Sequence, residues 1–209
     1  MVGVRSTGEV SLSTLSPGFS PSNCTSPAGE VIEAVYLAGL LHDVGKADPR
    51  FQQMLRGGDA VELALAKEPV AKSLTSATNS KAREEARRQA GWPRGLRHEL
   101  LSVALARSTD ELRSQACDWD LVLHLIASHH GWCRPLPAPV ADPAELLVTA
   151  QGEEELLSAS TAHGLTRIDG GVAERFWLLN ERYGWHGLAW LEAIVRLADH
   201  RQSEKETQA

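Results

Sequence analysis

The sequence predicts an all-α protein of about eight helices joined by long loops. Apolar residues recur at helical spacing in most segments, and no segment alternates with period two for long enough to indicate a strand. There is no GxGxxG or P-loop pattern of the kind found in nucleotide-binding α/β proteins. A length of 209 residues fits one domain with a sizeable core.

The chain is expected to have three parts. Residues 1–28 are rich in Ser, Thr, Pro and Gly, which predicts an irregular or disordered arm. Residues 29–203 form the helical domain, and residues 204–209 are expected to be a disordered tail.

The first predicted helix runs from Glu30 to Gly45 and is apolar nearly all round, which indicates that it is buried. Gly45 is a candidate C-cap, and Pro49 blocks continuation. Helical patterns then follow in eight further segments: 49–56, 61–68, 81–90, 97–108, 117–130, 152–160, 171–184 and 185–204. The proline-rich stretch 133–143 is incompatible with a helix and predicts a surface loop.

Net charge and hydropathy exclude some classes of protein. A formal charge of −6 argues against a protein that coats nucleic acid by bulk electrostatics. No apolar run reaches the length needed to span a bilayer, and the N-terminus lacks the apolar core of a signal peptide, so we expect a cytoplasmic protein. Five arginines offer either one local basic patch or a solvated helix face: Arg83, Arg87, Arg88, Arg94 and Arg97.

His42 and Asp43 end the long apolar helix. An ionisable pair at such a place is costly unless it is paired, hydrated or bound to a metal. Together the two side chains offer a nitrogen and an oxygen ligand, which suits divalent metals of intermediate hardness. Lys46, about one turn further on, is placed to stabilise negative charge on a substrate phosphate.

Three more histidines stand at helix ends. His98 opens a helix directly after a Gly-Trp-Pro-Arg-Gly loop, although a lone histidine beside an apolar helix is more often structural. His129 and His130 close a core helix, and Gly131 lets the chain turn so that both can face one site. Asp199 lies near the end of the last helix, where the helix dipole disfavours an anion unless something compensates.

The order H-D, H, H-H, D resembles the HD superfamily of metal-dependent phosphohydrolases. Four segments resemble the HD nuclease component of CRISPR type I interference systems: LAGLLHDVGKADPRFQQML, GLRHELLSVAL, LHLIASHHGWCRP and RLADHRQS. Their residues are most similar to those of subtype G (formerly U). That resemblance implies a compact HD-domain helical bundle, one or two divalent metals (Mn, Mg, Ni, Co or Fe), single-stranded DNA as substrate, and a superfamily 2 helicase with its interference complex as partner.

Transferred by motif, the family's metal ligands fall on six residues: His42, Asp43, His98, His129, His130 and Asp199. Asp43 and Lys46 take the catalytic roles, and Lys46, Arg97 and Arg134 the substrate-binding ones. The family usually has a further metal-binding histidine upstream, whereas this chain has no histidine before His42 and carries Leu15 near the expected position.

The sequence therefore predicts a metal-dependent phosphodiesterase in which His42, Asp43 and Asp199 hold one metal and Asp43 bridges towards a second, held by His98, His129 and His130. Two alternatives stay open. One is an HD phosphohydrolase acting on a nucleotide or another small phosphoester. The other is a catalytically degenerate HD module that docks on a helicase, which the missing upstream histidine favours.

Overall fold

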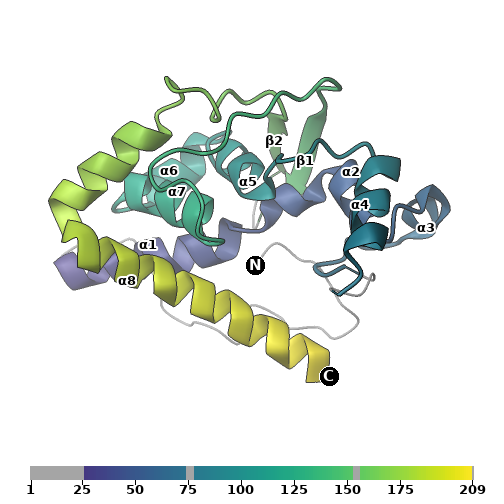
Figure 1. Ribbon diagram of the computed structural model, residues 1–209. Helices are drawn as coiled ribbons and strands as arrows, with labels where there is room; N and C mark the ends of the chain where they lie inside the picture. Colours follow the sequence, from purple (N-terminus) through teal and green to yellow (C-terminus); the bar gives the residue numbers. More distant parts are fainter. Residues whose placement is uncertain (1–25, 74–77, 153–155, 209) are drawn as a thin grey trace.

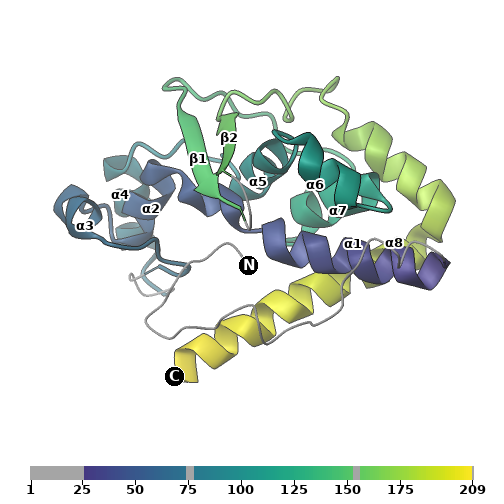
Figure 2. The same ribbon diagram turned by 180° about the vertical axis from the view of Figure 1, so that it is seen from behind.

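A computed structural model describes residues 26–73, 78–152 and 156–208, with the side chains of 203 and 205–208 excluded. Within these ranges the chain is mostly helical, as predicted, with one small hairpin (Figures 1 and 2). The elements are α1 (Pro27–Leu41), η3 (Val44–Ala47), α2 (Pro49–Leu55), α3 (Ala60–Leu65), α4 (Ser80–Gln89), α5 (His98–Ala106), α6 (Asp110–Gln115), α7 (Trp119–Ser128), β1 (Leu147–Gln151), β2 (Leu156–Ser160) and α8 (Val172–Gln208).

The core lies where α1, α5, α7 and α8 pack together. Every residue of α7 from Leu121 to Ser128 is buried, so this helix is enclosed by its neighbours on all sides. α1 and the second half of α8 lie side by side along one flank (Figures 1 and 2). Because α1 and α7 end at candidate ligands and α5 begins at one, the packing of these helices positions the ligands.

The predicted break between the last two helical segments is confirmed, at Gly184. This residue has φ +70° and ψ 163°, so α8 consists of two helical parts joined at a sharp bend. Glycine adopts such a conformation without the penalty that a Cβ would bring. α8 continues to Gln208, so the tail expected from residue 204 is helical as far as that residue.

Of the helix predicted over residues 152–160, the described residues 156–160 form a strand instead. Leu156–Ser160 is β2, which pairs antiparallel with β1 in the register Leu147↔Ser160. The alternation spans only five residues in β1, where exposed and buried side chains follow one another. Val148 and Leu157 are buried against the helical core, and this tertiary burial outweighs the local helical pattern.

Two boundaries also differ from the sequence-based expectation. α1 ends at Leu41 and not at Gly45, and His42 is its C-cap. The short helix α6 was not predicted; Thr109 caps it by accepting a hydrogen bond from the Glu111 backbone N–H. Most of the expected N-terminal arm lies outside the described residues, but Pro27 and Ala28 already belong to α1, with Ser26 as N-cap.

Gly45 lies where η3 crosses the start of α5. A Cβ at this position would come within 2.1 Å of the His98 carbonyl oxygen and 2.7 Å of the Ser102 backbone nitrogen. The Gly45 N–H donates to Ser102 Oγ (2.8 Å), which in turn donates to the His42 carbonyl (2.7 Å). Glycine therefore permits the close contact that brings the end of α1 to the start of α5.

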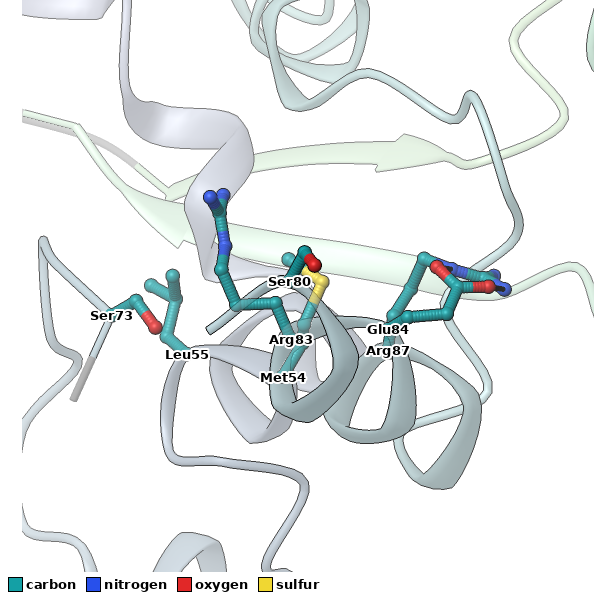
Figure 3. Close-up of a pocket in the computed structure, with 7 residues that line it drawn as sticks. All are labelled: Met54, Leu55, Ser73, Ser80, Arg83, Glu84 and Arg87. Atoms are coloured by element: carbon teal, nitrogen blue, oxygen red, sulfur yellow. Dashed lines mark hydrogen bonds and ion pairs between the residues drawn. The ribbon is translucent and has the colours of Figure 1, made fainter. Parts of the chain in front are cut away.

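A hollow of about 290 Å³ is lined by residues of α2 and α4 and by Ser73 (Figure 3). Figure 3 shows Arg87 beside Glu84 on α4, with the Arg83 guanidinium apart from them. Arg87 pairs with Glu84, and Arg88 pairs with Glu85. Arg88 is exposed, as expected for a solvated helix face, whereas Arg87 is only partly exposed and also donates to the Trp92 carbonyl. No helix in the described part of the chain combines the length and apolar character needed to cross a bilayer.

Candidate metal centre

Helix ends from four parts of the chain converge on one site. α1 ends at His42, and Asp43 precedes η3. α5 begins at His98, and α7 ends at His129. All six residues expected as ligands lie here, His130 and Asp199 included. The nitrogens of His98, His129 and His130 lie within 4.8 Å of one another, and so do the ligand atoms of His42, Asp43 and His129.

Asp43 lies at the centre of the cluster. Its Oδ1 is 3.4 Å from His98 Nε2 and 3.9 Å from His129 Nε2. Its Oδ2 is 3.4 Å from His42 Nε2 and accepts a hydrogen bond of 2.6 Å from Lys46 Nζ. The two carboxylate oxygens thus face different side chains: Oδ1 faces His98 and His129, and Oδ2 faces His42 and Lys46. A carboxylate that bridges two metals needs its oxygens directed to two sides in this way.

Two of the histidines have a defined tautomer. His42 Nδ1 lies 2.8 Å from the Gly39 carbonyl oxygen, and His129 Nδ1 lies 2.7 Å from the Ile126 carbonyl oxygen. Because a carbonyl only accepts, Nδ1 carries the proton in both rings, and Nε2 presents its lone pair to the site. An imidazole held in this way by the last turn of its own helix is pre-oriented as a metal ligand.

The atoms that face the centre lack hydrogen-bond partners. His42 Nε2, His98 Nε2, His129 Nε2 and Asp43 Oδ1 are buried, and none forms a hydrogen bond within the described residues. A buried polar atom without a partner is costly, and four around one point require an explanation. Three imidazole nitrogens and a carboxylate oxygen form a donor set that fits a divalent transition metal.

The electrostatics of Asp43 favour its ionised form. Burial alone would raise the pKa of this carboxyl, but the contact with His98 and the charges of His42 and Lys46 hold the pKa well below its usual range. Asp43 is therefore deprotonated at neutral pH, as a metal ligand must be.

The pKa values of His129 and His42 are shifted in opposite directions. Burial and the neighbouring imidazoles keep the pKa of His129 well below its usual range, so this ring is neutral. Burial would also lower the pKa of His42, but the contacts with Asp199 and Asp43 outweigh it and raise the pKa. Asp199 reaches the site from α8, with Oδ1 3.5 Å from His42 Nε2, and this contact lowers the Asp199 pKa.

The three expected substrate-binding cations have different surroundings. Lys46 donates to Asp43 and also lies 3.4 Å from the Ala71 carbonyl oxygen, so it borders the centre. Arg97 pairs with Glu99. Arg134 pairs with the buried Glu192 of α8, and its side chain is 40% exposed, so it links the Pro-rich loop to the core.

Neither Ser102 nor Glu99 was predicted to act at the site. Ser102 joins the backbones of His42 and Gly45. Glu99 is 1% exposed, and its Oε2 lies 3.4 Å from His98 Nδ1, where a carboxylate can orient the ring. Neither role has a local sequence signal, because Ser102 acts across 57 residues and Glu99 looks like an ordinary first-turn acid.

The family model described as Cas3, HD domain, matches residues 13–203, which is most of the chain. No curated protein and no solved structure matches.

Proposed function

The chain belongs to the family of the Cas3 HD domain, and from that premise we propose that it is a metal-dependent nuclease of CRISPR interference that cleaves single-stranded DNA together with a helicase partner. The observation that supports this most strongly is the convergence of four buried, unpartnered ligand atoms on one point, contributed by His42, Asp43, His98 and His129. His130 and Asp199 complete the proposed ligand set.

Divalent metals bound here would supply an activated water and neutralise charge on the phosphoryl oxygens. The protein's own groups would do the rest. Asp43, which is ionised, contacts His42 with one oxygen and His98 with the other, and so it fixes the two groups of ligands relative to each other. Lys46 stays within hydrogen-bond reach of Asp43 and offers a positive charge to the phosphate as the scissile bond breaks.

A cleavage assay tests the proposal. Wild type is expected to degrade labelled single-stranded DNA with Mn²⁺, Ni²⁺, Co²⁺ or Mg²⁺, and to leave duplex DNA largely intact. His42→Ala and Asp43→Ala are expected to lose more than about 100-fold in rate, because direct ligands matter more than the residues that support them. His186→Ala removes an exposed histidine outside the site and serves as the matched control.

Three results would contradict the nuclease. Equal residual cleavage by wild type and Asp43→Ala would place the activity elsewhere. Hydrolysis of nucleotides but not of oligonucleotides would indicate an enzyme for small phosphoesters. Absence of bound metal after reconstitution, together with tight binding to a helicase, would indicate a docking module.

A further inference from the structure

A second cavity, of about 260 Å³, adjoins the metal centre and has no assigned role. Two segments build it, and each also supplies candidate metal ligands. Arg97 and Glu99 flank His98, whereas Trp132 and Cys133 follow His130 after Gly131. Leu100, Ala127 and Pro137 make the rest of the wall mainly apolar.

Trp132 is presented to solvent by an unusual backbone. Gly131 (φ +83°) and Cys133 (φ +61°) on either side of it both adopt left-handed conformations, and Cys133 is a non-glycine residue for which this is unfavourable. As a result Cys133 is 2% exposed while Trp132 is 51% exposed. Backbone strain of this kind collects at functional sites.

Two of the three charged residues that border the cavity are arginines, Arg94 and Arg97. The Arg97 guanidinium lies 4.8 Å from the Trp132 ring centroid, and Arg94, also on the cavity wall, is exposed. Glu99 is almost fully buried, and its two oxygens face Arg97 and His98. A large exposed indole with arginines beside it is the combination that binds single-stranded nucleic acid, because bases stack and phosphates pair.

We propose that this cavity receives a nucleobase of the single-stranded DNA next to the scissile phosphate, with Trp132 as the stacking platform and Arg94 as a phosphate contact. The proposal rests on the proposed function, because it assigns a subsite to the same substrate. The wall is mainly apolar, so stacking dominates over hydrogen-bond readout, and the subsite accepts different bases. Trp132 lies only two residues from His130, so a nucleotide held here lies close to the metal centre.

The test measures binding without catalysis. An oligothymidine of about 12 nucleotides and an abasic strand of the same length are titrated by fluorescence anisotropy in EDTA. Wild type should bind the oligothymidine more tightly than the abasic strand. Trp132→Ala should weaken oligothymidine binding about tenfold and abasic binding little, since only the base can stack. Trp132→Phe should retain most of the affinity.

Trp190→Ala is the matched control. Trp190 is 65% exposed on α8, nine residues before Asp199 and therefore about 13 Å from it along the helix. This variant should bind both strands as wild type does. Arg94→Ala should weaken both strands alike and make binding less salt-dependent, because a phosphate contact does not depend on the base.

The subsite is refuted if wild type does not distinguish the two strands, if Trp132→Ala binds as wild type does, or if Trp132→Ala weakens both strands equally. The nuclease proposal fails separately. Base-dependent binding that needs Trp132, without cleavage under any metal, would retain the subsite and reject the nuclease. Cleavage with unchanged KM and binding in Trp132→Ala would retain the nuclease and reject the subsite.

Discussion

His163 shows how a single half-buried imidazole makes stability depend on pH. Burial lowers its pKa to about 4, and its Nδ1 accepts a hydrogen bond from the Leu165 backbone N–H. The neutral ring is thus the form that the fold accommodates. An unfolded histidine titrates near pH 6.5, so the unfolded chain takes up this proton first as the pH falls.

We therefore expect the contribution of His163 to be fully present above about pH 6.5 and to be lost between about pH 6.5 and pH 4, with a slope of at most about 1.4 kcal/mol per pH unit. Urea unfolding of wild type and His163→Asn across this range measures the difference. The asparagine oxygen can still accept from Leu165 but does not titrate, so the variant should show the shallower pH dependence. Parallel curves for the two proteins would contradict this role.

At the scale of elements, the contact between η3 and α5 determines whether the ligands meet. Gly45→Ala would force a Cβ against the His98 carbonyl, and we expect it to destabilise the fold by about 1–3 kcal/mol. Gly39→Ala, six residues earlier in α1, meets nothing within 4 Å and should stabilise by about 0.5–1 kcal/mol. Urea unfolding of both variants checks the pair, and a Gly45→Ala protein as stable as wild type would contradict the close approach.

The helices and the candidate ligands could be recognised in the sequence because both depend on local patterns. Long apolar periodicity predicted α1, α7 and the two parts of α8, and the histidines at the ends of α1 and α7 marked where the chain could leave the core. The hairpin was not predicted, because β2 is short and is buried by helices that are distant in the sequence. The hydrogen bond between Ser102 and the backbone of η3 was not predicted for the same reason, because its two partners are close only in the folded chain. Leu15, near the position of the expected upstream histidine, lies outside the described residues, so the choice between one metal and two stays a prediction.

At the scale of the whole molecule, the proposed centre joins α1, α5, α7 and α8, so metal binding should stabilise the entire fold. A metal present at about 100 times its dissociation constant adds about 2.7 kcal/mol. For a chain of this size that corresponds to a rise in Tm of about 5–10 °C. Thermal unfolding in Mn²⁺ and in EDTA measures it. Asp43→Asn, which keeps the side-chain size but removes the charge, should abolish the rise, while a full rise in that variant would place the metal elsewhere.

The directions of the helices that meet at the site determine an electrostatic field, which comes from their backbone dipoles. α1 and α7 end there, at His42 and His129, and α5 begins there, at His98. A helix C-terminus carries a partial negative charge and an N-terminus a partial positive one, each about half an elementary charge. The two C-termini favour a cation, whereas the one N-terminus favours an anion beside it. The backbone alone therefore provides a potential that suits a metal ion in contact with a phosphate, before any side chain is counted.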